Sequence, residues 1–248
     1  MNEHRNTKPG FLIAGILMFF IIFLFQVAVS KAGNYLSGLV DYKRIDPNDI
    51  FMGLTIHHAV QMFLTLGLIW LLARLLDVDF SLGIGYSRIG LRFLATFVAV
   101  FFAVALVYHF VIHLTGNLPV YDFPLTSGNI LGTLCFQLFM SGPSEEILYR
   151  ALPVTLFVYG FGRSIPVKDD VTLEIIAASL LFSIAHIQWS LAPFTFEVNS
   201  FQIIYAFVLG TIQGVAYQRS RSILYPMLMH SISNVLMVGM GYLFTLFL

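Results

Sequence analysis

Long apolar stretches recur along this chain, and they restrict what it can fold into. Seven segments are predominantly apolar over about twenty residues or more, the length that an α-helix needs to cross the hydrocarbon core of a bilayer. The segments are residues 11–29, 51–76, 91–114, 130–161, 171–189, 201–219 and 223–248. The sequence therefore predicts an all-α, polytopic membrane bundle of seven transmembrane helices, or of eight if the long fourth segment breaks at Gly142 and Pro143.

The composition agrees with a membrane protein and argues against two other classes. Hydrophobic residues make up 58% of the chain and charged residues only 10%, whereas soluble globular domains carry about 25% charged residues. The formal net charge is zero, so nothing indicates a nucleic-acid partner. The single cysteine, Cys135, can form no intrachain disulfide. The partner that the composition indicates is the lipid bilayer.

The distribution of Lys and Arg predicts the orientation of the chain in the membrane. Nine of these residues lie in the N-terminal segment, which holds Arg5 and Lys8, and in the second, fourth and sixth loops, whereas three lie in the first loop. Positive residues are retained on the cytoplasmic side. We therefore expect an integral, multi-pass membrane protein with a cytoplasmic N-terminus and an odd number of spans.

Charged residues lie inside the fourth apolar segment, in the stretch Gly142-Pro-Ser-Glu-Glu-Ile-Leu-Tyr-Arg150. A charged side chain at the bilayer centre costs roughly 2.5–3.5 kcal/mol, so such groups are rare and usually functional. Glu146 and Arg150 are four residues apart on a helix, so they can form an ion pair. Glu145 points about 100° away from Glu146 around the helix, so it cannot share the ion pair with Arg150. We expect its partner on another helix.

Three further polar residues lie in the later apolar segments. His186 follows Phe182 by one helical turn on the same helix face. His230 and Asn234 are likewise one turn apart in the last segment, so their side chains share a face. Because polar groups within a bilayer satisfy one another, we expect all of them to meet Glu145 in one cavity.

This set of groups suits the hydrolysis of an amide bond. Glu145, with His186, would bind a water molecule and remove its proton, and the resulting hydroxide would attack a peptide carbonyl. His230 and Asn234 would donate hydrogen bonds to the oxyanion that forms. Alternatively, Glu145, His186 and His230 could ligate zinc, with one position open for water. The residues alone leave both mechanisms open, so the cofactor is either zinc or none.

The same residues carry a resemblance to a known family. Glu-Glu-x-x-x-Arg at residues 145–150, Phe-x-x-x-His at 182–186 and His-x-x-x-Asn at 230–234 occur in the order of three motifs of the CAAX protease and bacteriocin-processing family, also called CPBP or Abi. Its best-known members are the type II CAAX prenyl endopeptidases, which are intramembrane proteases. The resemblance covers residues 131–238. On this basis we divide the chain into two parts. Residues 1–129 form three helices without a motif, and residues 130–248 form the catalytic helical core.

The resemblance implies an intramembrane endopeptidase that cuts a membrane-anchored protein or peptide, such as a prenylated CAAX substrate, near the cytoplasmic face. It implies a catalytic set and a supporting set of residues. The catalytic set is Glu145, His186, His230 and Asn234, and the supporting set is Glu146, Arg150 and Phe182. Family members are commonly called metalloproteases, while a metal-free, glutamate-dependent mechanism is also argued for the prenyl endopeptidases.

Other interpretations stay open at this point. A non-catalytic membrane protein could use Glu145 and His186 as the proton relay of a transporter, or keep the family's helices as an immunity protein or scaffold. His57 and His58, near the start of the second segment, are interpreted as interface residues. The sequence identifies neither the substrate nor the oligomeric state.

Overall fold

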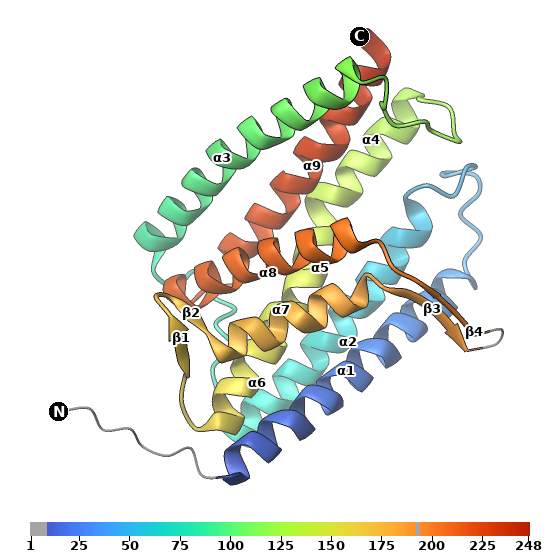
Figure 1. Ribbon diagram of the computed structural model, residues 1–248. Helices are drawn as coiled ribbons and strands as arrows, with labels where there is room; N and C mark the ends of the chain where they lie inside the picture. Colours follow the sequence, from blue (N-terminus) through green and yellow to red (C-terminus); the bar gives the residue numbers. More distant parts are fainter. Residues whose placement is uncertain (1–8, 192–193) are drawn as a thin grey trace.

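The chain folds into a bundle of helices with two short hairpins (Figure 1). The computed structural model describes residues 9–191 and 194–248, and most of them are helical. Five of the described helices are long and apolar enough to cross a membrane. They are α1 (Pro9–Ser37), α2 (Met52–Leu76), α3 (Ser87–Leu114), α8 (Ser200–Ser220) and α9 (Leu224–Phe247).

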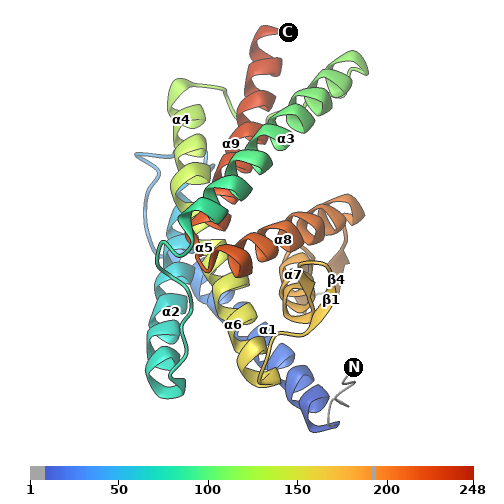
Figure 2. The same cartoon turned by 90° about the vertical axis from the view of Figure 1, so that its left-hand side faces the viewer.

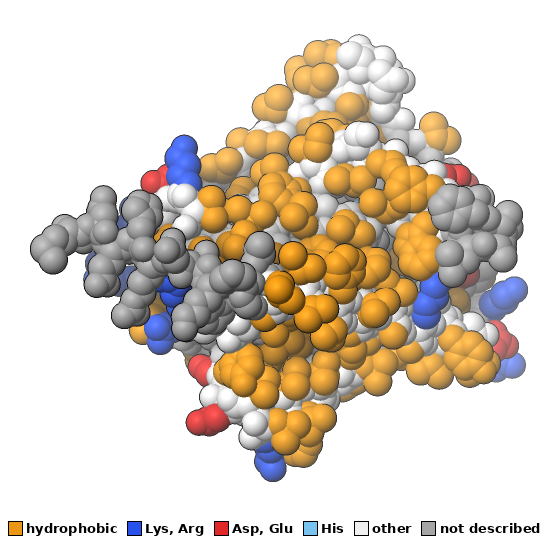
Figure 3. Space-filling view, turned by 60° about the horizontal axis from the view of Figure 1, so that its bottom comes forward, with side chains coloured by type: hydrophobic (Ala, Val, Ile, Leu, Met, Phe, Trp, Pro, Cys, Tyr) orange, Lys and Arg blue, Asp and Glu red, His pale blue; other side chains and the backbone are white. Residues whose placement is uncertain are grey.

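Hydrophobic side chains cover much of the outside of the bundle. Phe20 and Leu24 of α1 and Val100 and Val107 of α3 are exposed. Figure 3 shows such side chains over the middle of one face, with Lys, Arg, Asp and Glu towards its edges. A broad apolar surface of this kind is typical of a protein that contacts lipid. A helical membrane bundle is therefore confirmed, whereas the predicted orientation is untested, and Arg5 and Lys8 lie outside the described residues.

The fourth apolar segment is helical from end to end, but it is not one regular α-helix. It consists of α4 (Ser127–Phe136), the π-helix η1 (Gln137–Ser141), α5 (Gly142–Glu146), the π-helix η2 (Ile147–Ala151) and α6 (Leu152–Phe161). The expected break at Gly142 and Pro143 is thus a π-helical turn that ends just before Gly142. Pro143 has no N–H, and a local π adjustment lets the backbone continue around it.

The fifth apolar segment is shorter than predicted. Its helix, α7 (Leu173–Ala185), has only 13 residues, and the ends of the predicted 171–189 span belong to strands. Since the fourth segment is interrupted and the fifth is short, the count of seven or eight spans is not confirmed.

Two antiparallel hairpins flank α7, where only loops and helix were expected. The first pairs β1 (Pro166–Lys168) with β2 (Val171–Thr172), and Asp169 in the turn has a left-handed φ of 49° that Asp tolerates. The second pairs β3 (Gln188–Leu191) with β4 (Phe194–Glu197). β4 reads Phe-Thr-Phe-Glu, and aromatic and β-branched residues favour a strand.

The interrupted segment lies at the centre of the bundle. Figure 2 shows α4, α5 and α6 running down the molecule, with α2 on one side and α7 and α8 on the other. α5 packs against α2 and α9, and η2 packs against α7 and α8. α1 lies beside α2, and α3 lies beside α9. Side chains of α5 and η2 are therefore within reach of four other helices.

Gly142 allows α5 to approach α9 closely. A Cβ atom at this position would lie 2.6 Å from the carbonyl oxygen of Met227 and would also collide with the Ser231 hydroxyl. Both groups belong to α9, and a backbone carbonyl within a packed helix cannot move far. The helix contact that places the Glu pair thus depends on a residue without a side chain.

We expect Gly142→Ala to destabilise the protein. The added methyl overpacks the α5–α9 contact, so the free energy of unfolding should fall by about 1–3 kcal/mol. Thermal unfolding in detergent measures the change. Gly67→Ala is the matched control, because its Cβ would meet no atom within 4 Å and Ala favours a helix by roughly 1 kcal/mol over Gly. An unchanged melting temperature in Gly142→Ala would contradict the close approach.

Candidate active site

The predicted pair of Glu146 and Arg150 is present and fully buried. Arg150 Nε lies 3.4 Å from Glu146 Oε2, and both side chains have no exposed surface. Glu146 Oε1 lies 2.7 Å from Nδ1 of His230 on α9, and Arg150 donates a 2.9 Å hydrogen bond to Gln213 Oε1 on α8. The pair therefore links the central segment to two further helices.

Phe182 of α7 closes the other side of this pair. The centre of the Arg150 guanidinium lies 4.1 Å from the Phe182 ring centroid, a cation–π contact. The ring also contacts His186 edge-on at a centroid distance of 4.7 Å and lies 6.0 Å from the His230 ring. Phe182 thus connects the buried charge to both predicted histidines.

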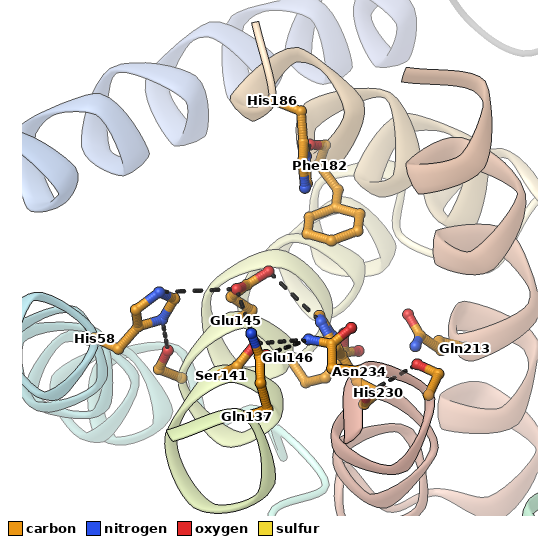
Figure 4. Close-up of polar contacts among 12 residues, drawn as sticks. His58, Gln137, Ser141, Glu145, Glu146, Phe182, His186, Gln213, His230 and Asn234 are labelled. Atoms are coloured by element: carbon orange, nitrogen blue, oxygen red, sulfur yellow. Dashed lines mark hydrogen bonds and ion pairs between the residues drawn. The ribbon is translucent and has the colours of Figure 1, made fainter. Parts of the chain in front are cut away.

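Glu145 faces other helices, as expected from its position on α5. Its Oε2 lies 3.8 Å from Nε2 of His230, and its Oε1 lies 3.9 Å from Nε2 of His58 on α2. The Ser141 hydroxyl donates to Oε1 over 3.3 Å. Figure 4 shows the two imidazoles on opposite sides of the carboxylate. Both separations exceed a direct hydrogen bond, so a water molecule can bond to the carboxylate and an imidazole together.

His58 is a residue whose position the sequence analysis got wrong. It was expected at the membrane interface, but only 12% of its side chain is exposed and its Nδ1 lies 2.6 Å from the Ser144 hydroxyl. A signal for this depth existed. His58 follows Phe51 by seven residues, just as His230 follows Ile223 by seven, so the two histidines lie equally deep in their spans.

Asn234 contacts two polar residues that the sequence analysis did not single out. Its Nδ2 donates to Gln137 Oε1 and to the Ser141 hydroxyl, over 2.9 Å in each case. Ser141 in turn donates to Glu145. Gln137, Ser141 and Glu145 recur every four residues in an apolar segment, which is a pattern that could have identified this polar face.

His186 lies near these groups without a direct contact to Glu145. Its Nδ1 lies 2.9 Å from the carbonyl oxygen of Phe182, one turn earlier on α7. Because a carbonyl only accepts hydrogen bonds, Nδ1 carries the hydrogen, and Nε2 of the neutral ring is left as an acceptor. Figure 4 shows His186 beside Phe182, apart from the contacts that join Glu145 and His230.

The four predicted catalytic residues line one cavity of about 630 Å³. Its walls beyond these residues are largely apolar and come from α3, α8 and α9, with Phe101, Val104, Leu209 and Met237 among them. The structure thus brings the polar residues of α5, α7 and α9 to one space. It also assigns a role to α3, which carries no motif, as part of the wall.

The zinc alternative does not fit this arrangement. Among residues 9–191 and 194–248, no group of three or more His, Cys, Asp or Glu side chains is placed to hold a metal ion.

Comparison with known proteins gives one match. Residues 127–236 match a family model described as "Type II CAAX prenyl endopeptidase Rce1-like". No curated protein and no solved structure matches the chain. The matched segment begins at the first residue of α4 and includes Glu145, His186, His230 and Asn234.

We expect the buried pair to support stability as a unit. Glu146→Gln and Arg150→Met should each lower the free energy of unfolding by about 3–5 kcal/mol, because each leaves an uncompensated buried charge. The double variant should lose less than the sum of the two single variants. Thermal unfolding in detergent of the wild type, the two single variants and the double variant gives a double-mutant cycle. Additive losses of stability would contradict a coupling between Glu146 and Arg150.

Arg219 provides the control for that cycle. It forms a 2.9 Å ion pair with Asp170, but about half of each side chain is exposed, at 55% and 48%. An exposed pair contributes about 0–1 kcal/mol. Arg219→Met should therefore leave the melting temperature nearly unchanged.

Proposed function

The chain belongs, through residues 127–236, to the family of Rce1-like type II CAAX prenyl endopeptidases, and on that premise we propose that it is an intramembrane endopeptidase with Glu145 as its general base. Family membership and the apolar helices make it an integral membrane protein with a membrane-anchored substrate. The observation that carries the proposal is the position of Glu145, a mostly buried carboxylate between His58 and His230 at the wall of a cavity.

The cavity supports a lipid-modified substrate. Apolar side chains such as Phe101, Leu209 and Met237 form its walls, while Glu145 and His230 provide polar groups. A substrate that carries an apolar anchor next to a peptide bond matches this arrangement of apolar walls and polar groups. We therefore propose a prenylated CAAX-type peptide, with the isoprenoid chain against the apolar walls and the scissile bond beside Glu145.

The proposed reaction begins with a water molecule at Glu145. The carboxylate removes one proton, and Nε2 of His186 accepts a hydrogen bond from the same water. The water oxygen forms a bond to the peptide carbonyl carbon, and the carbonyl oxygen becomes an oxyanion. When the tetrahedral intermediate collapses, the C–N bond breaks and the proton held by Glu145 passes to the leaving amine.

The oxyanion requires hydrogen-bond donors in a site with little water. Asn234 supplies Nδ2, which must exchange one of its bonds to Gln137 and Ser141 for the oxyanion. His230 is oriented through Nδ1 by Glu146 and donates through Nε2 when that nitrogen carries a proton. Glu146, Arg150 and Phe182 thus act by fixing His230 and the helix that carries Glu145.

We expect single substitutions to separate these roles in the cleavage of a fluorogenic prenylated CAAX peptide by detergent-purified protein. Glu145→Gln, His186→Ala and His230→Ala should abolish cleavage, and Asn234→Ala should lower kcat by about 10²–10³-fold, as for an oxyanion donor. Glu197→Gln, an exposed carboxylate in β4, is the matched control and should keep full activity. Each protein is also checked for folding by its melting temperature.

Two results would count against the proposal. Full turnover in Glu145→Gln would contradict the role of that carboxylate. No cleavage by the folded wild-type protein would favour another substrate or the non-catalytic alternative, a proton-coupled transporter or an immunity or scaffold homologue.

We expect cleavage to continue in the presence of the chelator 1,10-phenanthroline, because the described part of the chain gathers no set of three metal ligands. The assay is the same peptide cleavage, with the non-chelating 1,7-phenanthroline as the control for inhibition by the ring system itself. Loss of activity with the 1,10 isomer alone, restored by added zinc, would contradict a metal-free mechanism.

A further inference from the structure

A second, smaller cavity lies against Glu145. Its volume is about 160 Å³, and Ser30 of α1 together with His57, His58 and Gln61 of α2 line it. Glu145, Phe182 and His186 line both this cavity and the larger one. Glu145 therefore belongs to the wall between two spaces, one among α3, α8 and α9 and the other among α1, α2 and α7.

The chemistry of the smaller cavity suits water. Gln61 is 4% exposed, and its Oε1 has no hydrogen-bond partner among the described residues. Nδ1 of His57 likewise has none in this part of the chain. Buried polar groups of this kind are commonly satisfied by ordered water, and one water molecule takes up about 30 Å³ in the liquid. The cavity therefore has room for several water molecules.

This cavity adjoins a route to the surface. Ser30 and Tyr149 also line a neighbouring cavity of about 260 Å³ that extends to Lys31 and Trp189. Lys31 is exposed, and its ammonium lies 5.4 Å from the Trp189 ring centroid. Figure 1 shows this region where the hairpin β3–β4 lies beside the later part of α1. Because the two cavities share lining residues, a path from this surface to Glu145 would not cross the apolar cavity.

We propose that the smaller cavity is a water compartment that supplies the hydrolytic water to Glu145 from the side opposite to the substrate. The inference rests on the proposed endopeptidase function. A lipid-anchored substrate that fills the larger, apolar cavity excludes water from that side of the carboxylate. Hydrolysis consumes one water in each turnover, so a separate supply is required.

His58 is the positioning residue of this compartment. Its ring is held by the 2.6 Å contact between Nδ1 and the Ser144 hydroxyl and by edge-on packing against Phe136. Nε2 then faces Glu145 Oε1 at 3.9 Å, a separation at which one water can bond to both atoms. His58 orients the water and does not touch the substrate.

Hydration can be tested without any activity measurement. Radiolytic hydroxyl labelling of the purified full chain, read by mass spectrometry, oxidises side chains next to bound water. We expect His58 to be oxidised several-fold faster than His109, a histidine of α3 that is 2% exposed and bonds to its own helix at Ala105. Gln61→Leu should slow the oxidation of His58. Equal rates at His58 and His109 would overturn the water compartment.

The role of His58 in catalysis is tested by measuring kcat and KM separately for variants of this residue. His58→Phe keeps the shape of the ring without its nitrogens and should lower kcat by about 10–100-fold with KM unchanged. His58→Gln restores a polar atom near the position of Nε2 and should recover most of the rate. Gln61→Leu is a second variant and should also lower kcat alone, whereas Leu209→Phe, in the substrate cavity, should raise KM.

The outcomes separate this inference from the proposed function. Unchanged kcat in both His58→Phe and Gln61→Leu would overturn the supply of water from this side. No cleavage by the wild-type protein would instead overturn the endopeptidase proposal, while the labelling of His58 still decides whether the compartment holds water.

Discussion

The buried charges of Glu146 and Arg150 are the constraint on which the centre of this bundle depends. Neither side chain has any exposed surface, so each must be compensated within the protein. His230 on α9, Gln213 on α8 and the Phe182 ring on α7 provide that compensation. Three helices are thereby held around α5 and η2. The neighbouring Glu145 lies outside this pair, with its carboxylate facing His58 and His230 at 3.9 and 3.8 Å.

Sequence reasoning succeeded where a local rule decides the structure. The four-residue spacing of Glu146 and Arg150 predicts their contact on a helix, and the length of apolar runs predicts α1, α2, α3, α8 and α9. Sequence reasoning was less successful where contacts with other parts of the chain decide the structure. The alternating polar and apolar residues of β3, Gln-Trp-Ser-Leu, suit a strand as well as a helix, so the predicted fifth span was too long. The predicted catalytic roles are proposals that substitution must decide.

The contacts made by His58 and Asn234 show why the rest could not be predicted. Spacing along one helix says which residues share a face, but it does not say which other helix that face meets. His58 meets Ser144 across 86 positions of the chain, and Asn234 meets Gln137 across 97. Contacts of this kind follow from the packing of α2 and α9 against the central segment, which no short pattern encodes.

The two π-helical turns set the rotational phase of the central segment. A π turn contains about one residue more than an α turn, so it takes up the extra residue while the helix on either side keeps nearly the same phase. If the residues of η1 were wound as a regular α-helix instead, at about 100° per residue, α4 would turn relative to Glu145. Gln137 could then no longer face Asn234, although every side chain of the site would still be in the sequence. The π-helical winding between Gln137 and Glu145 is therefore as much a part of the site as the residues themselves.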